Sequence, residues 1–151
     1  DNQSSPGVVL GAIQNDLDIS LATYPSEKSH TPQVHTCNVK NVPLQKWVHL
    51  LLSVYGRSLD IYLDGKLVRT CVLPGIPKMP NNSPLYITPG GGFAGYTSKY
   101  QFSDQPSNPQ QAYNIYKQGF GGGSALGNLF NKYRIKVAFL DNNKEQGSLE
   151  L

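Results

Sequence analysis

The stretch that decides the fold is LDIYLDGKLVRTCVL, residues 59–73. In its first part, aliphatic residues alternate with polar or aromatic ones, which is the pattern of a β-strand with one buried face. Asp64-Gly65 follows, and a second strand pattern begins at Lys66. A type I′ turn needs positive φ at both central residues, and an Asp-Gly pair suits it. The stretch therefore predicts a β-hairpin.

Similar strand patterns lie on both sides of this hairpin. They cover residues 8–13, 17–22, 37–42, 46–55, 85–88, 93–102 and 133–139. One short helix is predicted between an N-cap at Asn108 and a C-terminal glycine at Gly119. Short strands separated by turn residues are typical of a β-sandwich. The sequence thus predicts an all-β protein, an antiparallel β-sandwich with one short helix.

The segment 46–55 is the most apolar part of the chain. Its nearly continuous apolar run favours a central strand that is covered on both faces. Trp47 would then be a core anchor, and the alternative is an exposed ring that stacks on a sugar. Tyr62 points to the face opposite Ile61 and Leu63, where we expect it to cover a second layer rather than to form a stacking surface.

Composition and charge exclude several classes of protein. The 15 Gly and 11 Pro in 151 residues argue against a helix bundle. The net charge is +3 without any basic run, so we expect no nucleic-acid partner. No apolar run approaches the ~20 residues that span a bilayer. A membrane would therefore be reached only through a segment outside this chain.

A glycine-rich segment divides the chain. We expect a sandwich over residues 1–120, a hinge over 121–128 and a C-terminal strand or arm over 129–151. Alternating apolar residues predict an amphipathic strand in this arm, which would reach a neighbouring molecule by strand addition. These residues are Tyr133, Ile135, Val137 and Phe139.

Cys37 and Cys71 both lie in strand patterns. They are either two buried free thiols or a cross-strand disulfide, which would contribute roughly 3–4 kcal/mol by closing its loop. The cysteines and three scattered histidines lack the spacing of a zinc site. Asp60 and Asp64 fall short of the oxygen ligands that calcium requires. We predict no metal or cofactor.

Two stretches carry a resemblance to a known family. VPLQKWVHL (42–50) and YGRSLDIYLDGKL (55–67) resemble the core of laminin-G-like domains in the concanavalin A-like lectin and glucanase superfamily. GGFAGY (91–96) and the helical segment 108–119 resemble later parts of that pattern. The resemblance covers about residues 6–120 and implies a concanavalin A-like jelly roll. The aromatic-rich first strands of the family are missing, or residues 8–13 take their place.

Within the superfamily, the chain looks closest to virion proteins of large DNA viruses of algae. GKLVRTCVL (65–73) and the segment 132–140 carry this second resemblance. It implies a non-catalytic binding or assembly module, a minor capsid or surface component whose partners are other virion or surface proteins. The implied location is the virion, with an extracellular location as the alternative.

The superfamily includes glucanases, so the resemblance also raises the question of glycoside hydrolysis. Glycoside hydrolysis generally uses two carboxylates across the scissile bond. The close acidic pairs are Asp16 with Asp18 and Asp60 with Asp64, without a context that raises a pKa, and no Gly-x-Ser-x-Gly elbow occurs. We predict no catalytic residues and no enzyme.

A lectin is the alternative, and a glucanase-like hydrolase is the less favoured one. The lectin would use loops 25–35, 74–84 and 103–108. The candidate ligand-binding aromatic residues are Tyr62, Tyr96, Tyr100 and Phe102.

Overall fold

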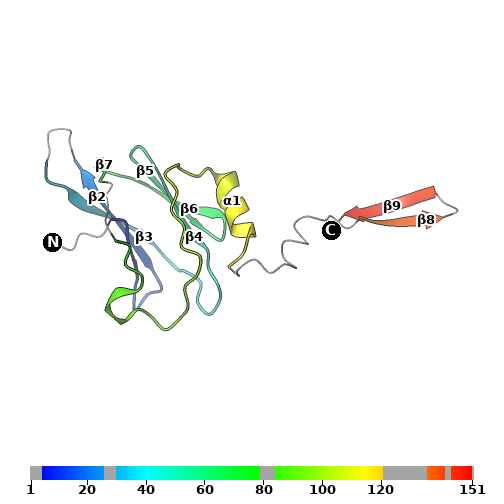
Figure 1. The fold of residues 1–151 in the computed structure, drawn as a ribbon, viewed down its shortest axis with the longest axis horizontal. Helices are drawn as coiled ribbons and strands as arrows, with labels where there is room; N and C mark the ends of the chain where they lie inside the picture. Colours follow the sequence, from blue (N-terminus) through cyan, green and yellow to red (C-terminus); the bar gives the residue numbers. More distant parts are fainter. Residues whose placement is uncertain (1–4, 26–29, 79–83, 121–135, 142–143, 151) are drawn as a thin grey trace. The chain divides into compact units, whose positions relative to one another are not determined.

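A computed structural model of the chain describes residues 5–25, 30–78, 84–120, 136–141 and 144–150. The chain divides into two compact units, residues 1–120 and 121–151. The first unit carries two antiparallel sheets and one α-helix, and the second carries a β-hairpin (Figure 1). The prediction of an all-β protein with antiparallel sheets and one short helix is confirmed. No helix among the described residues is long and apolar enough to cross a membrane.

The first sheet, here called the N-terminal sheet, is built around β2. β2 pairs with β3 along one edge and with β1 and β7 along the other. The strands are β1 (Gly7–Leu10), β2 (Leu17–Tyr24), β3 (Gln33–Val39) and β7 (Ile76–Pro77). The predicted strands 8–13 and 37–42 are therefore shifted, because each ends earlier than its apolar pattern. β7 was not predicted, since two residues carry no periodicity.

The second sheet, here called the central sheet, contains the hairpin predicted from residues 59–73. Its order is β4 (Leu50–Tyr55), β5 (Ser58–Leu63) and β6 (Lys66–Val72). Asp64 and Gly65 both have positive φ, 50° and 74°, as the type I′ turn requires. A shift in register next to Ile61 leaves Val68 without a partner in β5, so β6 contains a β-bulge.

The prediction that 46–55 forms a central strand is wrong, because β4 is an edge strand of its sheet. On one face of β4, Ser53 contacts the loop that precedes α1. The Ser53 hydroxyl donates to the Ser107 carbonyl oxygen at 3.0 Å and accepts from the Ser107 N–H at 2.9 Å. Trp47 is also not a core anchor: it is 42% exposed, and its ring stacks on Phe120 with centroids 4.5 Å apart.

The two sheets share one hydrophobic core. β2 and β3 contribute one side of it, and β5 contributes the other. The buried members are Leu17, Ile19, Leu21, Cys37, Val39, Val42, Leu59, Ile61, Leu63 and Leu73. These residues alternate along their strands, so burying one face of each strand holds the two sheets together.

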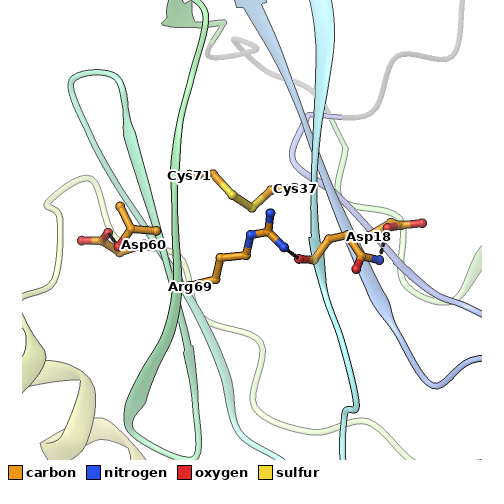
Figure 2. Close-up of a disulfide and its surroundings, with 7 residues drawn as sticks. Asp18, Cys37, Asp60, Arg69 and Cys71 are labelled. Atoms are coloured by element: carbon orange, nitrogen blue, oxygen red, sulfur yellow. Dashed lines mark hydrogen bonds between the residues drawn. A yellow bond between two sulfur atoms is a disulfide. The ribbon is translucent and has the colours of Figure 1, made fainter.

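A disulfide between Cys37 of β3 and Cys71 of β6 links the two sheets across this core. Figure 2 shows the bond between the two strands, with Arg69 beside it. The Arg69 guanidinium donates to the Asn38 carbonyl oxygen at 2.5 Å. The structure therefore fastens β3 to β6 both covalently and through a hydrogen bond.

The helix α1 (Pro109–Lys117) begins and ends close to the predicted residues. Asn108 is its N-cap and forms a capping box: the Asn108 side chain accepts from the Gln111 N–H at 2.8 Å, and the Gln111 side chain accepts from the Asn108 N–H at 2.9 Å. Gly119, just past the C-cap, has a φ of 71°. Ala112 on the inner side of α1 is fully buried.

Residues 84–108 connect the sheets to α1 and form no β-strand. A short 3₁₀ turn, η1 (Pro89–Gly91), interrupts an otherwise irregular course. The prediction of strands at 85–88 and 93–102 is therefore wrong. β-propensity forms a strand only when a partner supplies the other half of the hydrogen-bond ladder, and the described part of the chain pairs no strand with this segment.

The second unit holds an antiparallel pair, β8 (Lys136–Asp141) and β9 (Lys144–Glu150). β8 overlaps the predicted strand 133–139 at residues 136–139. Val137 and Phe139 of the predicted arm lie in β8. Tyr133, Ile135 and the predicted hinge 121–128 lie outside the described residues.

Candidate functional site

The irregular segment carries an unusual number of exposed aromatic side chains, here called the aromatic strip. Their exposed fractions range from 48% for Phe93 to 87% for Tyr96. The strip consists of Tyr86, Phe93, Tyr96, Tyr100 and Phe102. Single exposed apolar residues are common on proteins, whereas several along one short segment indicate a contact surface.

The backbone of the strip is unpaired as well. Among the described residues, 93–102 take part in no backbone–backbone hydrogen bond. The segment is held by side chains instead: the Ser98 hydroxyl donates to the Phe120 carbonyl oxygen at 3.0 Å, and the Lys99 ammonium donates to the Gly119 carbonyl oxygen at 2.9 Å. The segment thus presents aromatic side chains together with backbone groups that pair with no other backbone group in the described ranges.

A second candidate is an open groove of about 820 Å³, here called the basic groove. It is bordered by the end of β3, by the β5–β6 turn and by α1. Lys40, Lys66 and Arg69 line it together with two helix tyrosines, Tyr113 and Tyr116. Three separate parts of the chain therefore border the groove. Its shape depends on the position of α1 against the β5–β6 turn.

Gly65 allows α1 to pack closely against the β5–β6 turn. A Cβ at this residue would lie 3.1 Å from the Tyr113 Cα and 3.1 Å from the Tyr116 Cβ. The helix therefore packs directly on the turn, so closely that a Cβ at residue 65 would force it to shift by a few tenths of an ångström. This close approach brings both tyrosines to the groove, where their ring centroids are 6.2 Å apart and the rings are tilted by 49°.

Asp64, the other residue of the turn, organises the loop before β4. Its carboxylate accepts from the Lys46 ammonium at 2.8 Å and from the His49 N–H at 2.9 Å. Burial alone would raise the pKa of Asp64, but the hydrogen bonds from Lys46 and His49 outweigh it and lower that pKa. The carboxylate hydrogen bond in turn raises the pKa of Lys46. The Asp64 carboxylate is therefore bound to Lys46 and His49. It does not form an ion pair with Lys40, Lys66 or Arg69 of the groove.

His49 lies half-buried beside this carboxylate. Burial lowers its pKa, and the nearby Asp64 charge opposes the change without cancelling it. Its ring centroid is 6.1 Å from that of Tyr116. Its Nδ1 atom is buried without a hydrogen-bond partner among the described residues. His49 thus favours its neutral form and packs against the helix.

Two lysines give the groove its charge. Lys40 and Lys66 are both exposed, and within the described ranges neither has a carboxylate at ion-pair distance. Arg69 adds a third positive charge, although one of its donors already binds the Asn38 carbonyl oxygen. Since the Asp64 carboxylate is paired with Lys46, the groove presents net positive charge.

The predicted ligand-binding residues do not form one site. Tyr96, Tyr100 and Phe102 lie in the aromatic strip and are exposed. Tyr62 is 1% exposed, on the sheet face opposite the core, so it cannot stack on a ligand; burial, with a smaller effect from Asp60, raises its pKa. The structure places Tyr62 as a covering residue of the second layer.

The aspartates of the two close acidic pairs accept hydrogen bonds within the fold. Asp18 accepts from the Asn38 amide at 2.8 Å, and Asp16 accepts from the Asn41 N–H at 3.2 Å. Asp60 accepts from the Thr70 hydroxyl at 2.6 Å. Across the described ranges, no group of three or more His, Cys, Asp or Glu residues could hold a metal ion.

Sequence reasoning did not find the basic groove. Lys40, Lys66 and Tyr113 come from different elements, and no spacing along the chain connects them. A partial signal was present, because Tyr113 and Tyr116 are three residues apart and so share one side of the helix. The missing information was that α1 packs on Gly65.

Comparisons with known proteins add little. No family model matches the chain, and no curated protein matches it. One solved structure that is similar is an S-layer domain-containing protein from Clostridium thermocellum, with 9% identity and a TM-score of 0.39. The match covers 68% of this chain and 52% of the other, so this chain spans about half the length of that structure. A likeness this weak carries no inference about fold or function.

Proposed function

We propose that this chain is a non-catalytic assembly module that binds a neighbouring protein through the aromatic strip. The observation that carries the proposal is the combination found in residues 93–102: exposed aromatic side chains on a backbone that forms no backbone–backbone hydrogen bond with the described part of the chain. A strand edge of a neighbouring protein would satisfy both features, because main-chain hydrogen bonds give affinity and alternate side chains fill pockets.

The setting that we propose is the surface of a virus particle. The resemblance of GKLVRTCVL (65–73) to virion proteins of large algal DNA viruses supports it. The Cys37–Cys71 disulfide is compatible with it, since disulfides persist on virion and cell surfaces and are rare in the cytosol. From the separate resemblance of residues 42–50 and 55–67 to laminin-G-like domains, we infer a concanavalin A-like jelly roll as the parent architecture of the two sheets.

The absence of catalysis is part of the proposal. Each described aspartate that could form a catalytic pair already accepts a hydrogen bond from a neighbour in the fold. The pKa of Asp64 is lowered, whereas a general acid needs a raised pKa. These carboxylates therefore serve the structure.

Hydrogen exchange in purified particles tests the proposal. We expect amides 93–102 to exchange rapidly in the free chain and at least about tenfold more slowly in the particle, because strand pairing protects amides. Replacing Tyr96 and Phe102 by Ser should reduce incorporation, whereas Tyr55→Ser should not. Tyr55 is the matched control, since it is 76% exposed and lies outside the strip.

A second pair of variants separates backbone from side-chain binding. Thr97→Pro and Gln101→Pro each remove one N–H while leaving the aromatic residues in place. We expect at least one of them to reduce incorporation as strongly as the loss of Tyr96 and Phe102. Unchanged exchange of 93–102 in the particle, or full incorporation of every variant, would contradict the proposal, and so would the chain's absence from purified particles.

A further inference from the structure

The outer edge of β6 borders the basic groove. In the described part of the chain, β6 pairs with β5 on one side and with no strand on the other. We propose that a short acidic peptide, a segment of a partner protein rich in aspartate or glutamate, binds here in an extended conformation along residues 66–69. The inference does not rest on the proposed assembly function, because it uses residues outside the aromatic strip.

Charge is the first argument for an acidic partner. Lys40 follows β3 and Lys66 begins β6; both are exposed, and neither has a carboxylate at ion-pair distance in the described ranges. Arg69 adds a third positive charge at the groove wall. Asp64 also lines the groove, but both of its carboxylate oxygens already accept hydrogen bonds. Positive side chains that converge on one hollow attract a partner with more than one negative charge.

The backbone of β6 is the second argument. An edge strand carries main-chain N–H and C=O groups with which an extended peptide can pair. Val68 lies in the β-bulge of this strand, is 46% exposed and lines the groove between Lys66 and Arg69. Because side chains alternate along a strand, every second side chain of the peptide would face the groove. Carboxylates at these positions would meet the lysines, and their aliphatic stems would contact Val68.

The same edge disfavours a neutral strand. An exposed lysine and a β-bulge are two of the devices by which edge strands avoid pairing with other strands. A neutral partner would cover the Lys66 ammonium without compensating its charge, which costs free energy. A carboxylate removes this obstacle, and a short peptide has to follow the bulge over a few residues only. The edge therefore selects an acidic peptide against a neutral one.

The length of the available edge limits the partner to a short segment. The Cys37–Cys71 disulfide ties the C-terminal part of β6 to β3. Beside it, the Arg69 guanidinium donates to the Asn38 carbonyl oxygen (Figure 2). The stretch of β6 that can accept a peptide strand therefore ends near Arg69.

The tyrosines of α1 border the groove and favour a peptide over a nucleic acid. Tyr113 is 43% exposed and Tyr116 is 36% exposed, so each offers ring surface and a hydroxyl. Their rings are tilted by 49°, which does not suit successive bases stacked one after another on aromatic platforms. A peptide needs no such stacking, because its side chains pack on the rings and its carbonyl oxygens accept from the hydroxyl groups.

Fluorescence anisotropy with labelled octapeptides tests the inference. The first probe alternates glutamate with threonine, and the second alternates glutamine with threonine, so the two differ in charge alone. We expect the acidic probe to bind and the neutral probe to bind at least about tenfold more weakly, since at least two ion pairs are lost. Binding of the acidic probe should weaken with added salt.

Two N-methylated forms of the acidic probe test the pairing with β6. The N–H groups of alternate residues in a strand point to opposite sides. Methylating one alternate set therefore blocks the hydrogen bonds to β6, and methylating the other set leaves them in place. We expect one form to lose binding and the other to keep it. Equal behaviour of the two forms would overturn the proposed placement along β6.

Variants then locate the site. Lys40→Gln and Lys66→Gln should each weaken binding about fivefold, the loss expected for one exposed ion pair. Lys78→Gln is the matched control, since Lys78 follows β7 in the N-terminal sheet and does not line the groove. Val68→Ser should cost about threefold through lost apolar contact. Its control on the same strand is Val72→Ser, because Val72 is 74% exposed and lies outside the groove.

The inference is wrong if the acidic octapeptide does not bind at millimolar concentration, or if both lysine variants bind it as tightly as the native chain. Tighter binding of a short single-stranded oligonucleotide or a sulfated tetrasaccharide would also overturn it, because the groove would then recognise another class of polyanion. None of these outcomes bears on the aromatic strip, so the proposed assembly function is tested separately.

Discussion

His49 and Asp64 respond to acid in different pH ranges, although they are hydrogen-bonded neighbours. The folded chain lowers the pKa of His49 below 6.5, so between that lowered pKa and 6.5 the unfolded chain binds more protons. The free energy of unfolding should therefore fall as the pH drops through this range. For Asp64, the stabilising contribution is present above 3.8 and is lost only as the pH falls through its lower folded pKa.

Urea denaturation between about pH 7.5 and pH 5 measures the first effect. We expect His49→Gln to flatten the decline in the free energy of unfolding over this range. Asp64→Asn should lower stability near neutral pH and reduce the decline that we expect of the native chain below about pH 4. An unchanged slope in the His49 variant would assign the decline to other groups.

Single residues also show what sequence patterns reveal and what they do not. The Asp64-Gly65 pair correctly predicted a turn, because the backbone conformation of a type I′ turn restricts the residues that fit. The prediction that Trp47 is a core anchor was wrong. A large apolar residue next to an apolar run is compatible either with burial in a core or with stacking on another ring. Its partner Phe120 lies far along the chain, and no local pattern pairs the two.

At the scale of elements, the contact between the β5–β6 turn and α1 decides whether the basic groove exists. Gly65→Ala should lower the free energy of unfolding by about 2–3 kcal/mol, because it adds a crowded Cβ to a strained backbone. Gly56→Ala is the matched control: its φ is also positive, 55°, but a Cβ there meets nothing within 4 Å. It should cost about 1 kcal/mol.

Thermal and urea denaturation of both variants measure this difference. The Gly65 variant should also lose affinity for any ligand of the groove, since displacement of α1 carries Tyr113 and Tyr116 with it. Equal destabilisation by the two substitutions would mean that the helix does not rest on the turn.

Elements whose periodicity is strong and whose partners are close in sequence were predictable. The β5–β6 hairpin and α1 belong to this group, because turn chemistry and capping residues mark their ends. Residues 85–88 and 93–102 have strand-like composition without a strand partner in the described chain, and a partner is what turns propensity into structure. The basic groove was unpredictable for a related reason: it is made by packing between elements.

At the scale of the whole molecule, the disulfide joins two sheets that otherwise meet through their apolar faces. The sequence left the state of Cys37 and Cys71 open, because pairing across two sheets leaves no local pattern. Replacing both by Ala should lower the free energy of unfolding by roughly 2–4 kcal/mol, mainly because the unfolded chain regains freedom.

Urea denaturation with and without a reducing agent measures this effect. The native chain under reducing conditions should approach the double variant, and the variant itself should not respond to the reductant. If the oxidised native chain and the variant unfold at the same urea concentration, the disulfide contributes nothing to stability.

The position of the disulfide also sets how the first unit would behave under mechanical load. Cys37 and Cys71 are 34 residues apart, so when the chain is pulled from its ends the intervening loop is bypassed. Roughly 110 Å of contour length then stays hidden from the force, at about 3.4 Å per extended residue. The tension passes through the sulfur bridge instead of through β4, β5 and most of β6. The strands that carry the β5–β6 turn would thus remain shielded while the rest of the unit is stretched.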